Sequence, residues 1–398
     1  MKENILILNN ARYEHYYKNK KPVIDYNRYN VFFITKKEYA AEIPDNDYSE
    51  LHSINMSDSD AVFELARNIH LRYFINRVIA LSESNILDAA RIREFCGCKG
   101  MPFNQVLILR DKCLMKEYLS GKGINVPAFK KLYSTQNAIE FYQLYGRVVI
   151  KPALGMGSKN TYIIDTETKF NLALKCINNS ILDYEIEEFV DGDMYHCDSI
   201  IVDGHVKLCS VSKYLDSTCG YLESQPLASV MEDDENICSR LQTFNSMILK
   251  AFGIKNDVTH LEVFYKDSNI VFCEIAIRTG GGGIIDSVEQ KYSINLMETH
   301  LKLQLSQCEK LQLCSRDLYS GFVMFYAKPG IVVNITPADK FNQEWISKFK
   351  VYIKKGDRVI LPKYNGKPAA IVIIVGKTKD DLINKVEWVK SNFRISYI

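Results

Sequence analysis

The sequence predicts a mixed α/β protein of two or three domains, and three observations support this class. The chain has 398 residues, enough for several domains that each bury a core. Short apolar runs at residues 5–8 and 31–34 are typical of strands, and residues 61–69 have the apolar spacing of a helix. Further along, alternating runs separated by short polar turns predict antiparallel hairpins.

Composition excludes several classes of protein. Fifty basic and forty-eight acidic residues give a net charge of +2, which provides no electrostatic case for nucleic acid or an anionic membrane. No apolar stretch approaches the roughly 18 residues that span a bilayer, and the apolar run before Asn9 predicts a first strand and not a signal peptide. Eleven cysteines without a secretion signal favour reduced thiols in the cytoplasm. Cys96 and Cys98 have no second Cys/His cluster at zinc-site spacing, so we interpret them as structural.

The most informative pair in the chain is Glu262 with Glu274. Residues 260–265 and 270–276 read as strands, and the polar triplet 267–269 suits a three-residue turn that places the two glutamates opposite each other. Opposed side chains on one sheet face lie about 5 Å apart, so two carboxylates there repel unless a cation bridges them. Mg²⁺ prefers one or two carboxylates together with substrate phosphates, which also suggests a nucleotide. A solvated hairpin with two surface glutamates is the alternative.

Arg278 follows on the same face and precedes a run of glycines at 280–283. An arginine beside a metal pair, ahead of backbone that can approach a ligand, suggests phosphate chemistry.

Two upstream segments add to this interpretation. The apolar strand 148–151 ends in Lys151 and leads into a loop with Gly155, Gly157 and Ser158, whose backbone N–H groups could face phosphate oxygens. An ordinary exit from a strand would explain the loop as well.

Residues 194–202 and 205–215 flank an Asp203-Gly204 pair, a strong hairpin signal. A two-residue turn there places Lys213 opposite Met194, on the face that also carries His196 and Asp198. That face either lines a site, or His196 is a buried core histidine; the sequence leaves both open.

The order of these motifs resembles the ATP-grasp superfamily, and more closely its carboxylate-amine ligases that act on amino acids. The resemblance covers roughly residues 86–376: Arg110-Asp111-Lys112 opening a helix, the strand with its glycine loop, the segment 187–192, the glutamate hairpin, and Arg278. Two departures stand out. Ala276 occupies a place where the family often has a metal-binding asparagine, and Met194 one where many members have a ribose-binding glutamate.

The resemblance implies a role for each matched residue. Lys112 and Lys151 would reach the ATP phosphates, and the loop containing Gly155, Gly157 and Ser158 would close over them. Glu187, Glu188 and Val190 would hold adenine. Glu262 and Glu274 would bind Mg²⁺, with Mn²⁺ as an alternative, while Arg278 would hold the acyl-phosphate and Lys213 would contact the γ-phosphate; both are expected to be catalytic.

The implied architecture is an ATP-grasp fold of three parts. These are an N-terminal α/β domain (1–105), the ATP-grasp domain (106–315, with a lid at about 113–187), and a C-terminal sheet domain (316–398) expected to serve as scaffold. The implied activity is an ATP-dependent ligase that converts a carboxylate, expected to belong to an amino acid, into an acyl-phosphate and joins it to an amine, releasing ADP and phosphate.

Two alternatives stay open at this point. One is an acyl-phosphate ligase with a carrier-protein thiol or an amino sugar as acceptor, and the other is a nucleotide-binding module without turnover. The expected partners are small carboxylate and amine substrates, with a carrier protein and a homodimer left open.

Overall fold

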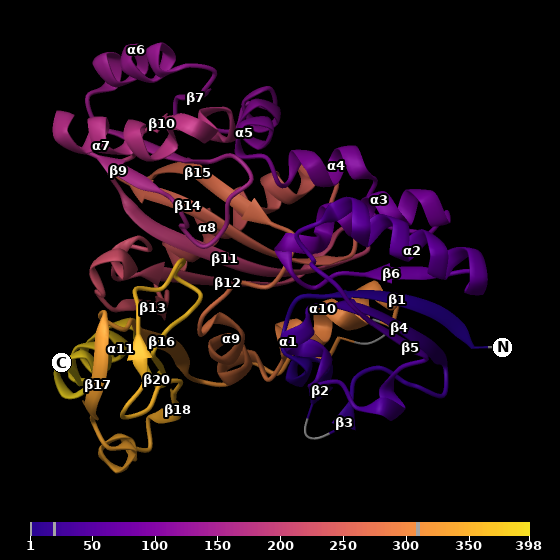
Figure 1. Ribbon diagram of the computed structural model, residues 1–398. Helices are drawn as coiled ribbons and strands as arrows, with labels where there is room; N and C mark the ends of the chain where they lie inside the picture. Colours follow the sequence, from indigo (N-terminus) through magenta and orange to yellow (C-terminus); the bar gives the residue numbers. More distant parts are fainter. Residues whose placement is uncertain (1, 19–20, 308–310) are drawn as a thin grey trace.

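The computed structural model describes residues 2–18, 21–307 and 311–398. Figure 1 shows an N-terminal α/β region, a central antiparallel sheet with a small sheet region above it, and the C-terminal strands at the lower left. The mixed α/β class is therefore confirmed. No helix in the described ranges is both long enough and apolar enough to cross a bilayer.

The N-terminal region is a parallel sheet with strand order β5-β4-β1-β6. Its strands are β1 (Glu3–Asn9), β4 (Tyr29–Thr35), β5 (Glu50–Ser53) and β6 (Arg77–Ile79). The helices are α1 (Lys37–Ala40), α2 (Ser59–Tyr73) and α3 (Ile86–Cys96), and β2 (Tyr17–Lys18) pairs with β3 (Lys21–Pro22). Asp58 caps α2 by accepting a hydrogen bond from the backbone N–H of Ala61 at 3.0 Å. The predicted strands at 5–8 and 31–34 and the helix at 61–69 are confirmed.

Above the central sheet lies a small antiparallel sheet with order β7-β10-β8-β9. It consists of β7 (Phe129–Lys131), β8 (Val148–Pro152), β9 (Tyr162–Ile164) and β10 (Tyr184–Glu188), with α6 (Thr135–Tyr145) and α7 (Glu167–Ile177) packed on one face. Successive side chains of each strand point to opposite faces of this sheet. Ile150 and Ile186 are buried against the helices, so Lys151, Glu185 and Glu187 point the opposite way, toward the central sheet.

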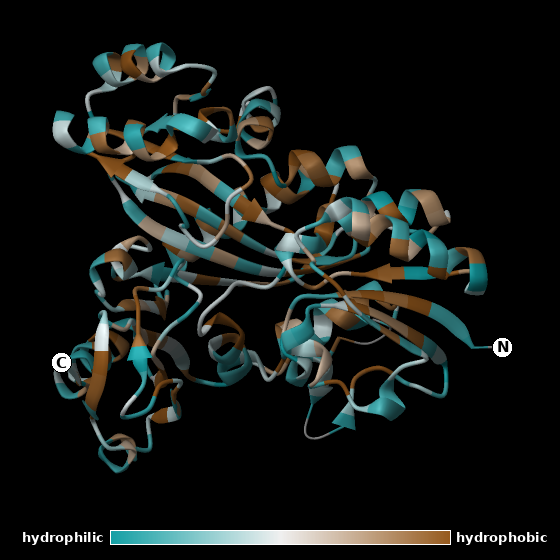
Figure 2. Ribbon diagram, viewed as in Figure 1, coloured by the Kyte–Doolittle hydropathy of each residue, from teal (hydrophilic) through white to brown (hydrophobic). Residues whose placement is uncertain are grey.

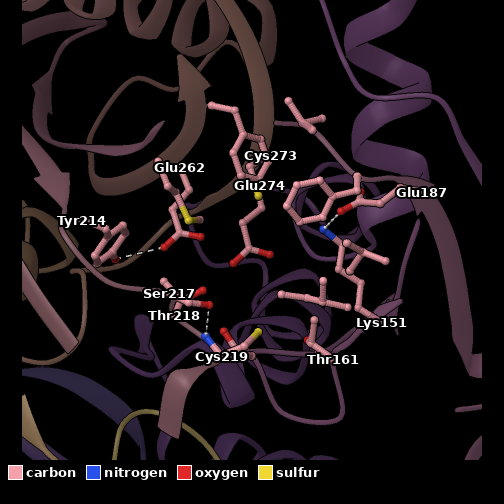
Figure 3. Close-up of a pocket in the computed structure, with 18 of the residues that line it drawn as sticks. Lys151, Thr161, Glu187, Tyr214, Ser217, Thr218, Cys219, Glu262, Cys273 and Glu274 are labelled. Atoms are coloured by element: carbon pink, nitrogen blue, oxygen red, sulfur yellow. Dashed lines mark hydrogen bonds and ion pairs between the residues drawn. The ribbon is translucent and has the colours of Figure 1, made fainter. Parts of the chain in front are cut away.

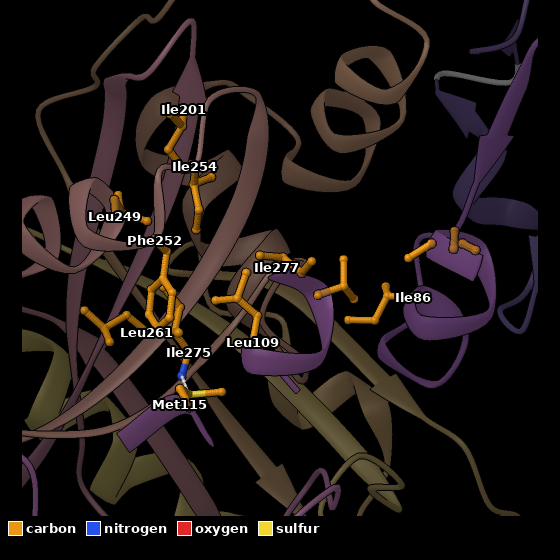
Figure 4. Packing of buried hydrophobic residues seen from close by; sticks show 14 of the residues in the cluster. Ile86, Leu109, Met115, Ile201, Leu249, Phe252, Ile254, Leu261, Ile275 and Ile277 are labelled. Atoms are coloured by element: carbon orange, nitrogen blue, oxygen red, sulfur yellow. Dashed lines mark hydrogen bonds between the residues drawn. The ribbon is translucent and has the colours of Figure 1, made fainter. Parts of the chain in front are cut away.

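The central sheet places the predicted glutamate pair. Its strands are β11 (Asp193–Val202), β12 (His205–Tyr214), β13 (Leu227–Met231), β14 (Asp257–Lys266) and β15 (Asn269–Ala276). Helix α8 (Glu235–Phe252) packs on one face, whereas α9 (Ile284–Tyr292) and α10 (Leu296–Gln304) pack on the other. Helices α4 (Phe103–Ile108) and α5 (Lys112–Ser120) connect the N-terminal region to this layer. Figure 4 shows the core they share, with Leu109 and Met115 close to Leu261 and Ile275.

The C-terminal strands extend the same sheet. Strand β16 (Tyr319–Phe325) pairs with β13, and β20 (Ala370–Gly376) and β18 (Ile346–Val351) follow, giving the order β15-β14-β11-β12-β13-β16-β20-β18. The remaining strands β17 (Gly330–Ile335), β19 (Arg358–Val359) and β21 (Ile395–Tyr397) form a second sheet, and α11 (Lys379–Asn392) covers β16 and β20. In Figure 2 the strands carry many brown residues alternating with white and teal ones, and the outer helices are banded teal and brown. The same sheet therefore contains strands from both sides of the predicted boundary near residue 316, because β13 pairs with β16. The three-domain division stays a prediction.

The β14–β15 hairpin has the predicted pairing but a different turn. Glu262 pairs with Glu274, as predicted. The turn, however, has two residues and not three, because Asp267 and Ser268 both adopt positive φ. A register shift next to Glu262 leaves Cys273 as an extra residue, and this β-bulge restores the pairing that the longer turn would have produced.

The predicted register of the β11–β12 hairpin was wrong. The two-residue turn at Asp203-Gly204 is present, with φ of 52° and 77°. A bulge between Ile200 and Ile201 then shifts the register, so that Lys213 pairs with Tyr195 and not with Met194. Because neighbouring positions face opposite sides of a sheet, this one-residue shift turns Lys213 away from the glutamates.

Candidate active site

A cavity of about 340 Å³ lies between the small upper sheet and the glutamate hairpin. Every predicted nucleotide and metal residue lines it: Lys112, Lys151, Gly155, Gly157, Ser158, Glu187, Glu188, Val190, Glu262 and Glu274. Figure 3 shows Glu262 and Glu274 pointing into it from one side and Lys151 with Glu187 from another. The fold therefore brings together residues from five separate segments of the chain.

The two glutamates retain oxygen atoms that could bind a cation. Oε1 of Glu262 accepts hydrogen bonds from the Tyr214 hydroxyl at 3.1 Å and from Nε2 of His260 at 3.3 Å. Oε2 of Glu274 lies 3.0 Å from Nζ of Lys112. The other oxygen of each carboxylate has no protein partner within the described ranges. An opposed pair of half-satisfied carboxylates suits Mg²⁺, which takes oxygen ligands.

Charge around Glu274 keeps it ionised. Burial alone would raise its pKa, but the ammonium groups of Lys112 and Lys151, with the more distant Arg278, lower the pKa of Glu274 to about 2. It is thus an anion at every physiological pH. Ala276, where the family often has a further metal ligand, lies opposite His260 in the sheet. The imidazole of His260, and not a carboxamide, therefore contacts Glu262.

A buried ion cluster lies where the upper sheet lines the cavity. Nζ of Lys151 lies 2.6 Å from Glu187, and Nζ of Lys116 bridges Glu185 at 2.7 Å and Glu187 at 2.5 Å. Burial disfavours the charged form of Lys151, but Glu187 outweighs it and holds the pKa of Lys151 well above its ordinary value. The cluster balances two cations against two anions.

Lys116 is a member of this cluster that the sequence analysis missed. It lies one helical turn after Lys112, so both lysines share a face of α5, and Glu185 alternates with Glu187 on β10. That spacing was the available signal, but nothing in the sequence says which face of α5 meets β10.

The glycine loop is held in place by parts of the chain remote in sequence. Gly157 has φ +60°, and its carbonyl accepts a hydrogen bond from the backbone N–H of Asn365 at 3.1 Å. The carbonyl of Ser158 accepts one from the Tyr221 hydroxyl at 3.0 Å. A Cβ on Gly157 would lie 3.0 Å from Oδ1 of Asn365, so glycine is needed both for the backbone conformation and for the close approach. The C-terminal region thus contacts the site as well as extending the sheet.

Arg278 lies beside the cavity, not in its lining. Its Nε lies 2.7 Å from Oε2 of Glu83, and the same carboxylate binds Arg110. The Arg278 side chain as a whole is 20% exposed. Glu83 comes from the N-terminal region and was not predicted, because its partners follow it by 27 and 195 residues.

The glycine run after Arg278 packs closely against its surroundings. A Cβ on Gly283 would lie 2.4 Å from Phe322, and one on Gly280 would lie 2.5 Å from Ile284, so close packing requires both glycines. Among the four glycines at 280–283, Gly281 alone has no atom within 4 Å of the place that a Cβ would occupy.

His196 belongs to a buried polar network behind Glu262. Its Nδ1 lies 2.6 Å from Asp198, whose other oxygen lies 2.9 Å from Nδ1 of His260. Burial would lower the pKa of His260, but Asp198 outweighs it and raises that pKa to about 10, so His260 is a cation that donates to Glu262. His196 is therefore a buried, hydrogen-bonded histidine that does not line the cavity.

Lys213 is not brought into the site. Its Nζ lies 2.6 Å from Asp193 and 5.8 Å from the ring centroid of Tyr195, on the other face of β12. Tyr214 lies on the cavity side instead and binds Glu262.

Comparisons with known proteins agree with this geometry. Residues 145–286 match the model of the ATP-grasp domain family. The chain is 25% identical over 295 residues to an L-arginine-specific L-amino acid ligase of Bacillus subtilis, covering 71% of each chain.

Solved structures show the same fold. An L-amino acid ligase from Bacillus licheniformis superimposes with a TM-score of 0.79 at 16% identity, covering 100% of this chain and 99% of that one. A phosphoribosylglycinamide synthetase from Anaerococcus prevotii gives 0.71 at 17% identity, covering 100% of both chains. The chain therefore has the ATP-grasp fold, and its residues 145–286 match the ATP-grasp domain family.

Proposed function

We propose that the protein is an ATP-dependent ligase that joins the carboxylate of an L-amino acid to an amine. The observation that carries this proposal is the opposed pair Glu262 and Glu274, within reach of Lys112, in a cavity that is large enough for part of a nucleotide and has Arg278 at its edge. Similarity to an amino-acid ligase supports the substrate class.

The nucleotide would lie between the upper sheet and the glutamate hairpin. Lys151 and Lys112 would contact phosphate oxygens, while backbone groups at residues 188–190 would hydrogen-bond the base. Both oxygens of Glu187 already bind lysines, so its contribution is to fix those lysines in place. Glu262 and Glu274 would hold Mg²⁺, with Mn²⁺ as an alternative, and the metal would neutralise charge on the phosphates.

The first step transfers the γ-phosphoryl group. A carboxylate oxygen of the amino acid forms a bond to the γ-phosphorus as the bond to the β-phosphate oxygen breaks, yielding an acyl-phosphate and ADP. Lys112 and Lys151 would stabilise the charge on the transferring group, which is where catalysis of phosphoryl transfer chiefly lies.

The second step forms the amide. The amine attacks the acyl carbon, loses a proton, and phosphate departs with the bonding electrons. Arg278 would stabilise the oxyanion through its planar guanidinium, and Glu83 would hold that group in one orientation. The loop at Gly157, braced by Asn365, would exclude water from the acyl-phosphate.

A phosphate-release screen tests the proposal. Purified protein is incubated with ATP, Mg²⁺ and mixtures of L-amino acids, and the products are identified by mass. We expect ADP, phosphate and a product whose mass is the sum of two substrates less water. Glu274→Gln is the control and should remove most of the release because one metal ligand loses its charge.

Two outcomes would contradict the proposal. Nucleotide binding without phosphate release in any mixture would favour a binding module. Full activity of Glu274→Gln would show that the metal is held elsewhere.

A further inference from the structure

A second cavity, of about 470 Å³, lies between the N-terminal region and the central sheet and shares no lining residue with the nucleotide cavity. Asp257, at the start of β14, lines it, whereas Glu262 on the same strand lines the nucleotide cavity. Five residues of strand separate these positions by about 16 Å. Figure 4 labels Ile86, Ile254 and Ile277, three of the apolar side chains around it.

The lining of this cavity carries an excess of positive charge. Arg77, Arg93, Lys99 and Lys255 face a single carboxylate, that of Asp257. Arg77 is neutralised by Glu3 at 2.8 Å, and Asp257 is engaged by Nε2 of His300 at 3.0 Å. In the ranges that the structure describes, none of the other three cations has a carboxylate within ion-pair distance.

Arg93 is held against the cavity wall by its contacts with Val78 and Gly100. Its Nε donates to the carbonyl of Val78 at 3.0 Å, and its terminal nitrogens have no acceptor among the described residues. The side chain lies against Gly100, where a Cβ would be 2.7 Å from Cδ of Arg93. Burial lowers the pKa of Arg93, which reflects the cost of holding this charge away from water. A half-buried guanidinium with free donors at the wall of a cavity is the arrangement that binds carboxylates and phosphates.

From this geometry we propose that the cavity is a second ligand site, which binds a small organic anion with an apolar part, either a carboxylate or a phosphate ester. Arg93 would bind the anionic group, and Lys99 and Lys255 would add charge at the opening. Because Arg93 belongs to the N-terminal region and Ile254 and Ile277 to the central layer, the ligand would contact both. Ile277 directly precedes Arg278, so an occupant would touch the segment that carries the catalytic arginine.

Calorimetry with two probe anions tests this site in the full-length chain. Sulfate represents a phosphate group and succinate a carboxylate, and each is titrated in the presence of saturating ADP and Mg²⁺, so that the nucleotide cavity is occupied. The variants are Arg93→Gln and Lys255→Gln. Arg91→Gln is the matched control, because Arg91 lies on the exposed side of the same helix and pairs with Asp60.

We expect at least one probe to bind, and the better probe identifies the anionic group. Both test variants should weaken binding by about tenfold or more, as expected for the loss of a charged contact, and Arg91→Gln should bind as the parent does. If Arg93→Gln fails to fold, Lys255→Gln decides, because Lys255 is exposed. Binding of neither probe, or equal affinity in Lys255→Gln and the parent, would overturn the proposal.

Discussion

Replacing Lys116 with methionine should destabilise the upper sheet more than any surface substitution in α5. Lys116 is fully buried and binds both Glu185 and Glu187, which are buried as well. Methionine fills a similar volume but leaves two carboxylates to share Lys151. Breaking a buried pair by removing one partner costs about 3–5 kcal/mol.

The cost should depend on pH in a defined direction. Burial would raise the pKa of Glu187, but Lys116 and Lys151 outweigh it and lower that pKa in the parent protein. The stabilisation from this carboxylate is present above its unfolded pKa, about 4.3, and is lost as pH falls through the lower folded value. In Lys116→Met the folded pKa rises, so the variant can take up a proton. The difference between parent and variant should therefore shrink as pH falls below about 5.

The assay is hydrogen exchange of the β8 and β10 amides, read beside unfolding in urea, because a chain of several sheets need not unfold in one step. Lys122→Met is the matched control, since Lys122 is exposed just beyond the same helix. The double variant Lys116→Met with Glu185→Gln restores the charge balance and should recover part of the loss. Equal stability of Lys116→Met and Lys122→Met would refute the reasoning.

Three further predictions concern the site itself. Arg278→Lys should bind ATP nearly as well as the parent by calorimetry yet form about 10²-fold less amide by mass spectrometry, because lysine loses the planar fork; unimpaired turnover would mean that another group holds the oxyanion. Gly157→Ala should raise the KM for ATP in phosphate-release assays, because residue 157 has a positive φ and its new Cβ would press on Asn365. An unchanged KM would show that the loop tolerates the methyl group. Tyr214→Phe removes one hydrogen bond to Glu262 and should raise the Mg²⁺ concentration needed for half-maximal ADP binding roughly tenfold. The same Mg²⁺ requirement in variant and parent would contradict a role for Tyr214 in positioning Glu262.

The sequence alone was enough to predict the fold class and which residues would gather around one cavity. Apolar runs, turn pairs and the order of the motifs led to the resemblance to the ATP-grasp superfamily, and the predicted nucleotide and metal residues line one cavity. These residues were predictable because each belongs to a local pattern, such as Lys151 at the end of an apolar strand or Glu262 and Glu274 across a short turn. Local patterns depend on nearest neighbours in the chain, which the sequence shows directly.

Tertiary structure decided everything that depends on register or on distant contacts. A single bulge turned Lys213 out of the site and brought in Tyr214, and another kept Glu262 opposite Glu274 despite a shorter turn. Bulges depend on how a strand packs against the rest of the sheet, so turn length alone cannot predict them.

The same limit applies to the groups that brace the site. Lys116 binds Glu187, which is 71 residues away in the sequence, and Glu83 binds Arg278, which is 195 residues away. The anionic ligand site at Arg93 likewise exists only where the N-terminal region meets the central sheet. Charges are paired or left unpaired by the packing of whole elements, and this packing is a property of the folded chain and not of any one segment.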